Sequence, residues 1–204
     1  MKIVLGALLF FTFQNAQARG YSESVQHEKG LISLSFFAGS QENRLLNQDA
    51  SYSSLSGWHG GASLDVAIYS SNGGGQLRLF GSYIFSELKD KLDSSTSVQK
   101  SEMLYGAKAY VSPWLFLGVG YGQSEQKFTS SSNTVTTNDS LLAGGIGVEY
   151  GISNSWSLGL QGWYKMNPIA KQPDSEGNSF SDGYDMSLVL IWSPPTTTIT
   201  RQNK

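Results

Sequence analysis

Residues 114–123 read WLFLGVGYGQ, and from Leu117 onward bulky apolar side chains alternate with glycine. A period of two residues is typical of a β-strand whose two faces meet different surroundings. Alternation of this kind recurs in eight segments of 10–13 residues each, longer than the roughly 5 or 6 residues of a globular strand. A tilted strand that crosses a bilayer needs about 9–11 residues. We therefore predict transmembrane strands at 31–40, 57–69, 76–87, 101–112, 114–123, 140–150, 155–166 and 183–193.

One face of these segments is apolar throughout. It comprises 39 positions, such as Leu34, Leu117 and Leu188, and none of them is charged. The opposite face is rich in serine and glycine, which could not keep the whole outside of a soluble protein hydrated. Small residues and a few balanced charges suit a crowded interior instead, so we expect the apolar face to point into lipid. Seven charged residues on the small-residue face are predicted to form a network in the lumen: Asp65, Arg78, Glu102, Lys108, Glu149, Lys165 and Asp185.

Aromatic residues of the apolar face gather near the two ends of the predicted strands. Such rings prefer the two water–lipid interfaces of a membrane. Trp114 lies near the short turn at 112–113, but by the alternation its side chain would point inward. A bulge after Pro113 would turn it outward. The two predicted belts consist of Trp58, Tyr83, Phe85, Tyr105, Tyr121, Tyr164 and Tyr184 at one end, and Tyr150, Trp156 and Trp192 at the other.

The connections alternate in length. Short turns are expected at 70–75, 112–113 and 151–154, and long polar loops at 41–56, 88–100, 124–139 and 167–182. An open sheet edge in hydrocarbon would leave backbone groups without partners, so the sheet has to close. The prediction is an all-β fold: a closed eight-stranded antiparallel up-and-down transmembrane barrel, with both termini on the short-turn side.

The first 18 residues have the features of a secretory signal peptide. Lys2 precedes an apolar run from Ile3 to Phe13, and the sequence AQA at 16–18 fits a cleavage site. We therefore expect residues 1–18 to be removed, 19–29 to form a periplasmic segment, 30–193 to form the barrel and 194–204 to form a polar tail.

This pattern resembles the small eight-stranded outer-membrane β-barrels of the OmpA/OmpX type. The resemblance covers about residues 30–193 and includes the final segment GYDMSLVLIW at 183–192. It implies a monomer in the outer membrane of a Gram-negative-type cell, in contact with outer-membrane lipid and inserted by the barrel-assembly machinery. Members of this family usually end at the closing aromatic residue, whereas this chain continues past Trp192 to Lys204.

Composition excludes several classes of function. The 204 residues include no cysteine, which removes disulfide scaffolds, thiol catalysis and cysteine metal sites. A net charge of -2 without a basic block argues against a nucleic-acid partner. No cofactor or metal motif is present. The mean hydropathy of -0.23 would suggest a soluble domain, but it averages a lipid-facing surface with polar loops and a lumen of serine and glycine.

The leading functional hypothesis is a non-enzymatic structural or surface-interaction protein that acts through four long extracellular loops, with a lumen plugged by the charge network. The sequence does not identify the partner of these loops. Side chains such as Phe37, Tyr69, Phe80 and Phe116 are predicted to fill the rest of the interior. The alternatives are a narrow pore for small solutes or ions, a lipid-modifying barrel enzyme and a soluble periplasmic binding barrel. The enzyme hypothesis depends on His59, which has serines close by in sequence.

Overall fold

The structure is a computed structural model, and it describes residues 30–46, 52–70, 75–91, 97–130, 133–166 and 179–194. The predicted signal peptide, the segment 19–29 and most of the predicted tail lie outside these ranges. Among the described residues there is no helix of the length and hydrophobicity that a membrane crossing requires.

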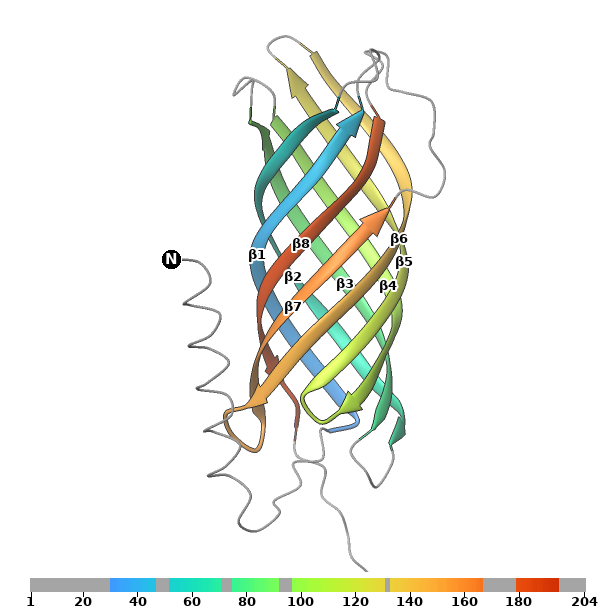
Figure 1. Cartoon of the computed structure of the whole chain (residues 1–204), viewed down its shortest axis with the longest axis vertical. Helices are drawn as coiled ribbons and strands as arrows, with labels where there is room; N and C mark the ends of the chain where they lie inside the picture. Colours follow the sequence, from blue (N-terminus) through green and yellow to red (C-terminus); the bar gives the residue numbers. More distant parts are fainter. Residues whose placement is uncertain are drawn as a thin grey trace, which may run out of the picture.

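Eight strands form one closed antiparallel barrel in which each strand pairs with its neighbours in sequence and β1 pairs with β8 (Figure 1). The predicted fold class is thereby confirmed. We call the end at which β1 terminates the upper end; the lower end carries the short turns. The strands are β1 Ile32–Leu46, β2 Tyr52–Ser70, β3 Gln76–Asp90, β4 Ser97–Ser112, β5 Leu115–Ser130, β6 Asn133–Gly151, β7 Trp156–Met166 and β8 Ser179–Trp192.

The strands are longer at the upper end than predicted. The predicted long loops at 41–56, 88–100 and 124–139 are therefore largely strand, whereas residues 167–178 still separate β7 from β8. β5 and β6 pair from Leu115↔Val148 up to Ser130↔Asn133, so the predicted loop 124–139 is mostly hairpin. Segments 47–51, 91–96, 131–132 and 167–178 separate the strands at this end. The polar outer face of the upper strands explains the error. Gln99 and Lys127 are exposed there while Leu88 and Val98 are buried inside, so the apolar-outward alternation of the lower strands is lost.

Two predicted orientations are affected by irregularities near the lower end. In β2 the pairing with β3 shifts between Ala67 and Tyr69, which leaves Ile68 as an extra residue. Such a bulge reverses the side on which the next residue points. Tyr69 is accordingly 63% exposed, so its predicted place in the lumen is wrong. Trp114, in the tight turn after β4, is also exposed, and a register shift precedes it in β4.

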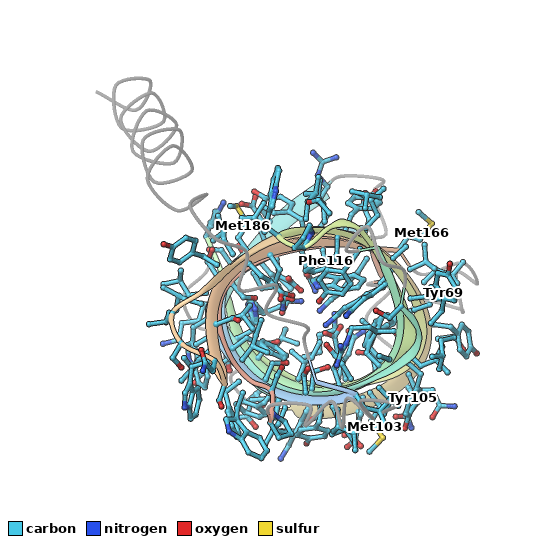
Figure 2. The ribbon with its side chains drawn as sticks, turned by 90° about the horizontal axis from the view of Figure 1, so that it is seen from below. Tyr69, Met103, Tyr105, Phe116, Met166 and Met186 are labelled. Atoms are coloured by element: carbon cyan, nitrogen blue, oxygen red, sulfur yellow. The ribbon has the colours of Figure 1, made fainter. Side chains whose placement is uncertain are left out.

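The apolar face points outward along the whole barrel. Side chains such as Leu117, Leu188 and Val119 are exposed, whereas Phe80, Leu104 and Phe116 on the opposite face are buried. Figure 2 shows Phe116 inside the barrel wall and Met103, Met166 and Met186 outside it. An exposed apolar band of this extent is stable in lipid but not in water.

Leu188 lies midway between Tyr184 and Trp192 on the outer face of β8, at the centre of the apolar band. We expect Leu188→Arg to lower the free energy of unfolding in lipid vesicles by about 2–4 kcal/mol, because the guanidinium enters hydrocarbon. Gln99→Arg, on the exposed face of β4 above the band, is the matched control and should change it by less than about 1 kcal/mol. If urea titrations showed that Leu188→Arg and Gln99→Arg lower the free energy of unfolding equally, Leu188 would not face lipid.

Candidate functional site: the interior of the barrel

The interior contains eight charged side chains that are at most 9% exposed, four basic and four acidic among the described residues. They form two groups, each with two positive and two negative charges. The upper cluster consists of Lys100, Glu102, Lys165 and Asp185, and the lower cluster consists of Asp65, Arg78, Lys108 and Glu149.

The upper cluster is a chain of alternating charges. Glu102, which is fully buried, lies 2.5 Å from Lys100 Nζ through Oε1 and 2.6 Å from Lys165 Nζ through Oε2. Lys165 also lies 2.7 Å from Asp185 Oδ2. These residues come from β4, β7 and β8, so the ion pairs connect opposite walls of the barrel. Buried ions are costly unless paired, and here each charge has an opposite partner within contact distance.

The lower cluster has a different construction. Lys108 Nζ donates to Asp65 Oδ2 at 2.9 Å and lies 5.0 Å from the centre of the Phe80 ring. The Tyr110 hydroxyl donates to Glu149 Oε1 at 2.6 Å. Arg78 donates to Ser33 Oγ at 2.6 Å and to the Gly30 carbonyl at 3.1 Å, so it ties the wall to the start of the first strand.

A layer of aromatic rings lies against the lower cluster. The Trp163 ring centre is 5.3 Å from that of Phe80 and 6.4 Å from that of Phe116. Glycines on the neighbouring strands make room for the indole: a Cβ added to Gly145 on β6, which pairs with Trp163, would lie 2.4 Å from it, and one added to Gly118 on β5 would lie 2.6 Å from it. The inward glycines therefore accommodate bulky side chains in a narrow barrel.

Little empty space remains between the two clusters. One cavity of about 10 Å³ is lined by Lys108, Gln161 and Asp185, and a second of similar size by Asp65, Lys108 and Glu149. A cavity of roughly 10–15 Å³ holds about one water molecule. The polar groups around each cavity could bind such a water.

His59 has no accessible partner for catalysis. Its Nε2 lies 2.7 Å from Ser187 Oγ on β8, and both residues are 1% exposed. Ser54, one of the serines near His59 in sequence, instead donates to Glu42 Oε1 on the outer face at 2.7 Å. The described residues contain no group of histidine and acidic side chains that could hold a metal ion.

Sequence reasoning placed the seven charges on the inward face but not their pairing. Asp65 and Arg78 lie on adjacent strands, yet the Asp65 carboxylate pairs with Lys108, while Arg78 donates to the Asp65 carbonyl at 3.4 Å. The ion pairs fall into two groups, with Glu102, Lys165 and Asp185 in the upper cluster and Asp65 and Lys108 in the lower. Lys100 was missed because it was assigned to a loop; its alternation with Glu102 was the available signal.

The aromatic residues predicted as belts lie on the outer face. At the upper end the Trp58 and Phe85 rings are 5.7 Å apart, and Tyr105 pairs with Tyr121 across β4 and β5. At the lower end Trp156 pairs with Trp192. Several upper hydroxyls bind polar groups above them: Tyr184 donates to Glu42 at 2.7 Å, Tyr164 to Asp182 at 2.5 Å, and Tyr121 to Ser140 at 3.3 Å. The remaining belt residues Tyr83 and Tyr150 are exposed, and Phe85 is partly so.

A closed eight-stranded barrel with an apolar outside and a packed, polar inside has the architecture of a transmembrane β-barrel of the outer-membrane type. Among solved structures the chain is similar to neisserial surface protein A, NspA, with a TM-score of 0.56 and 14% identity over 79% of this chain and 96% of that chain. This likeness shows the shared fold.

Two further structures are similar at lower scores. Ail, the attachment invasion locus protein of Yersinia pestis, has a TM-score of 0.46 and 12% identity over 78% of this chain and 97% of that chain. The N-terminal β-barrel domain of Pseudomonas aeruginosa OprF has a TM-score of 0.39 and 13% identity over 81% of this chain and 98% of that chain. No protein-family model and no curated protein matches the sequence.

Glu102 is the shared partner of two buried lysines, so its loss should be more damaging than the loss of one ion pair. We expect Glu102→Gln to lower the free energy of unfolding by about 3–5 kcal/mol. Adding Lys100→Met should recover at least half of that loss, because Lys165 keeps Asp185 as its partner. Urea titration of the refolded variants measures both; a single-variant effect below about 1 kcal/mol would contradict the pairing.

Gly144 and Gly145 are adjacent but face opposite sides of the wall. A Cβ at Gly145 meets the Trp163 ring, whereas one at Gly144 meets nothing within 4 Å. We therefore expect Gly145→Ala to destabilise the barrel by about 1–3 kcal/mol and Gly144→Ala to leave it unchanged. Trp163→Leu should partly restore the Gly145→Ala variant. The measurement is the urea midpoint of unfolding. Equal midpoints for Gly145→Ala and Gly144→Ala would exclude a tight contact between residue 145 and the Trp163 ring.

Proposed function

We propose that this protein is a structural outer-membrane barrel of a Gram-negative-type cell, with a closed lumen and a surface-interaction role at its upper end. The observation that carries the proposal is the uncharged outer band bounded by aromatic residues at both ends, combined with charge-balanced packing inside. The signal peptide at 1–18, insertion by the barrel-assembly machinery, the monomeric state and periplasmic termini belong to the same proposal.

A closed lumen follows from how the interior is filled. The ion pairs join opposite walls, the Trp163 ring lies over Gly145 and Gly118, and the cavities between the clusters have room for about one water each. A hydrated ion needs a continuous channel. This packing supports a plug over the alternative of a narrow pore.

A non-catalytic role is supported by the environment of His59. The pair of His59 with Ser187 resembles a base and nucleophile in spacing, yet both are 1% exposed within the packed upper lumen. A substrate would have to displace the upper cluster to reach the serine. We therefore assign the pair a structural role, in which Ser187 positions the histidine ring.

The surface role is assigned to the extended upper strands rather than to long loops. Above the aromatic residues the outer face becomes polar, with Glu125, Lys127 and Thr136 exposed on β5 and β6. These positions suit an environment outside the hydrocarbon. They present a polar sheet surface to the outside of the cell.

The proposal predicts two properties of the purified protein refolded in lipid. Its gel mobility should change on boiling, because the closed barrel stays folded in detergent until heated. Planar bilayer recordings should show no stable openings, because the lumen is packed. Unchanged mobility and a soluble cellular fraction would contradict the membrane assignment, whereas steady large openings would contradict the plug and favour the pore.

A further inference from the structure

The strands that run toward the upper end carry a repeated charge pattern on their outer face. In β1, β3 and β5 an acidic residue above the aromatic residues is followed, two positions later, by a basic residue. Residues two positions apart in a strand point to the same side. In each pair the carboxylate therefore lies nearer the apolar band and the cation lies farther from it. The pairs are Glu42 with Arg44, Glu87 with Lys89, and Glu125 with Lys127.

The pair on β1 has partners within the protein. Glu42 Oε1 lies 3.1 Å from Lys91 Nζ, and the Tyr184 hydroxyl donates to Glu42 Oε2 at 2.7 Å. Arg44 lies opposite Asp182 in the pairing of β1 with β8. On this side of the barrel the protein itself supplies groups that interact with the outer charges.

The pairs on β3 and β5 are different. Their four charged side chains make no hydrogen bond or ion pair with any other described residue, and Lys89, Glu125 and Lys127 are exposed. Only β4 separates the two strands, and its exposed Gln99 pairs with Glu87 on one side and with Lys127 on the other. We call this surface the upper outer patch: Glu87, Lys89, Gln99, Glu125 and Lys127.

The upper outer patch continues the lipid-facing surface without a break. The pairing of β3 with β4 has no register shift, and that of β4 with β5 shifts only beside the lower turn. Directly below the patch, Tyr83, Met103, Tyr105 and Tyr121 are 50–58% exposed, and Figure 2 shows Met103 and Tyr105 outside the wall. The patch therefore faces sideways, toward whatever stands beside the barrel immediately above the hydrocarbon. In a membrane that neighbour is a lipid headgroup.

The height of the polar surface indicates the size of this headgroup. On β5 the outward residues from Gln123 to Thr129 are polar and exposed. Thr129 lies roughly 20 Å above Tyr121, at about 3.3 Å per residue and a tilt of about 40°. A phospholipid headgroup layer is only about 5–8 Å thick. At the lower end, by contrast, β6 ends at Gly151, directly after the belt residue Tyr150. The upper layer is therefore thick and polar, as a saccharide headgroup would be.

The side chains of the upper outer patch fit a saccharide that carries phosphate groups. Lysine binds phosphate as a point charge. Carboxylate oxygens accept hydrogen bonds from hydroxyl groups, and the Gln99 amide both donates and accepts. A phospholipid without sugars would place only its negative charge beside Glu87 and Glu125, which would repel it. The two carboxylates thus favour a headgroup with hydroxyl groups close to the hydrocarbon.

We infer that the upper outer patch binds the saccharide headgroup of an anionic glycolipid in the outer leaflet. Lys89 and Lys127 bind its phosphate groups, while Glu87 and Glu125 accept hydrogen bonds from its hydroxyl groups. This inference rests on the proposed outer-membrane orientation. It deepens that proposal by naming the class of lipid and the side of the barrel that holds it.

The test is a titration of fluorescently labelled lipopolysaccharide, a phosphorylated glycolipid, into the refolded protein in micelles of neutral detergent. Lys127→Gln removes one positive charge from the patch. Arg44→Gln removes one from the β1 side, beside Asp182, and is the matched control. Heat-dependent gel mobility shows that each variant is folded. Its absence in the wild type would contradict the barrel assignment, separately from the lipid site.

We expect the affinity to fall about fivefold for Lys127→Gln, since a lysine near an anionic lipid surface contributes about that much, and at least tenfold for Lys89→Gln/Lys127→Gln. It should stay within twofold for Arg44→Gln. Dephosphorylated lipopolysaccharide should bind the wild type at least fivefold more weakly. Equal losses for Lys127→Gln and Arg44→Gln would overturn the inference.

Two further measurements separate saccharide binding from attraction to any anionic lipid. Labelled phosphatidylglycerol, which has a phosphate but no sugar, should bind at least tenfold more weakly than lipopolysaccharide. Glu87→Ala/Glu125→Ala should weaken lipopolysaccharide binding at least threefold, because the hydroxyl acceptors are lost. A surface that acts by charge alone would bind more tightly after two negative charges are removed. Tighter binding by this variant, or equal affinity for phosphatidylglycerol, would contradict a saccharide site.

Discussion

The pairing of β1 with β8 is the interaction on which the rest of the structure depends. In hydrocarbon no water is available to the backbone, so every strand must have a neighbour on both sides. Thirteen paired positions, from Leu34↔Trp192 to Leu46↔Ser179, connect the first strand to the last. Once the sheet closes with eight strands, its interior is only wide enough for side chains. The alternation of small and bulky inward residues, and the balance of charges, follow from that limited space.

The same constraint distinguishes the two ends of the molecule. Closure is obligatory only where lipid surrounds the wall, and there the eight strands are continuously paired. Above the aromatic residues water can also satisfy the backbone, and β5 and β6 continue there to Ser130 and Asn133. The lower end has short turns and exposed apolar residues such as Ile152. The barrel is thus closed along the apolar band, and several described strands extend beyond its upper aromatic residues.

Much of this fold could be predicted from the sequence, because lipid on one side and packed side chains on the other impose a strict period of two. Strand number, topology and the side on which residues such as Leu188 or Glu102 lie all follow from that period. The upper strands were not predicted, since their outer residues are polar and the apolar-outward pattern stops, as around Lys100, which is itself buried. The bulge in β2 could not be predicted either, because one extra residue at Ile68 turned Tyr69 outward without any local sequence signal.

The pairing of the charges lies beyond the reach of sequence reasoning for a different reason. The period-two alternation shows whether a side chain points inward or outward, but it does not show how far along the barrel axis or where around the barrel that side chain lies. Lys165 and Asp185 could be matched because their strands are neighbours, whereas Glu102 and Lys165 meet across the lumen from β4 and β7 at 2.6 Å. Contacts across the lumen depend on the shear of the closed barrel. Only the three-dimensional register sets which lysine meets which carboxylate.

The closure itself can be tested directly because the chain has no cysteine. Ala38 pairs with Leu188 across β1 and β8, and with Gly60 across β1 and β2. Oxidation of the variant Ala38→Cys/Leu188→Cys in membranes should form an internal disulfide that alters mobility on a non-reducing gel, as the control Ala38→Cys/Gly60→Cys should. Cross-linking of the control without cross-linking of the β1–β8 pair would contradict a closed barrel.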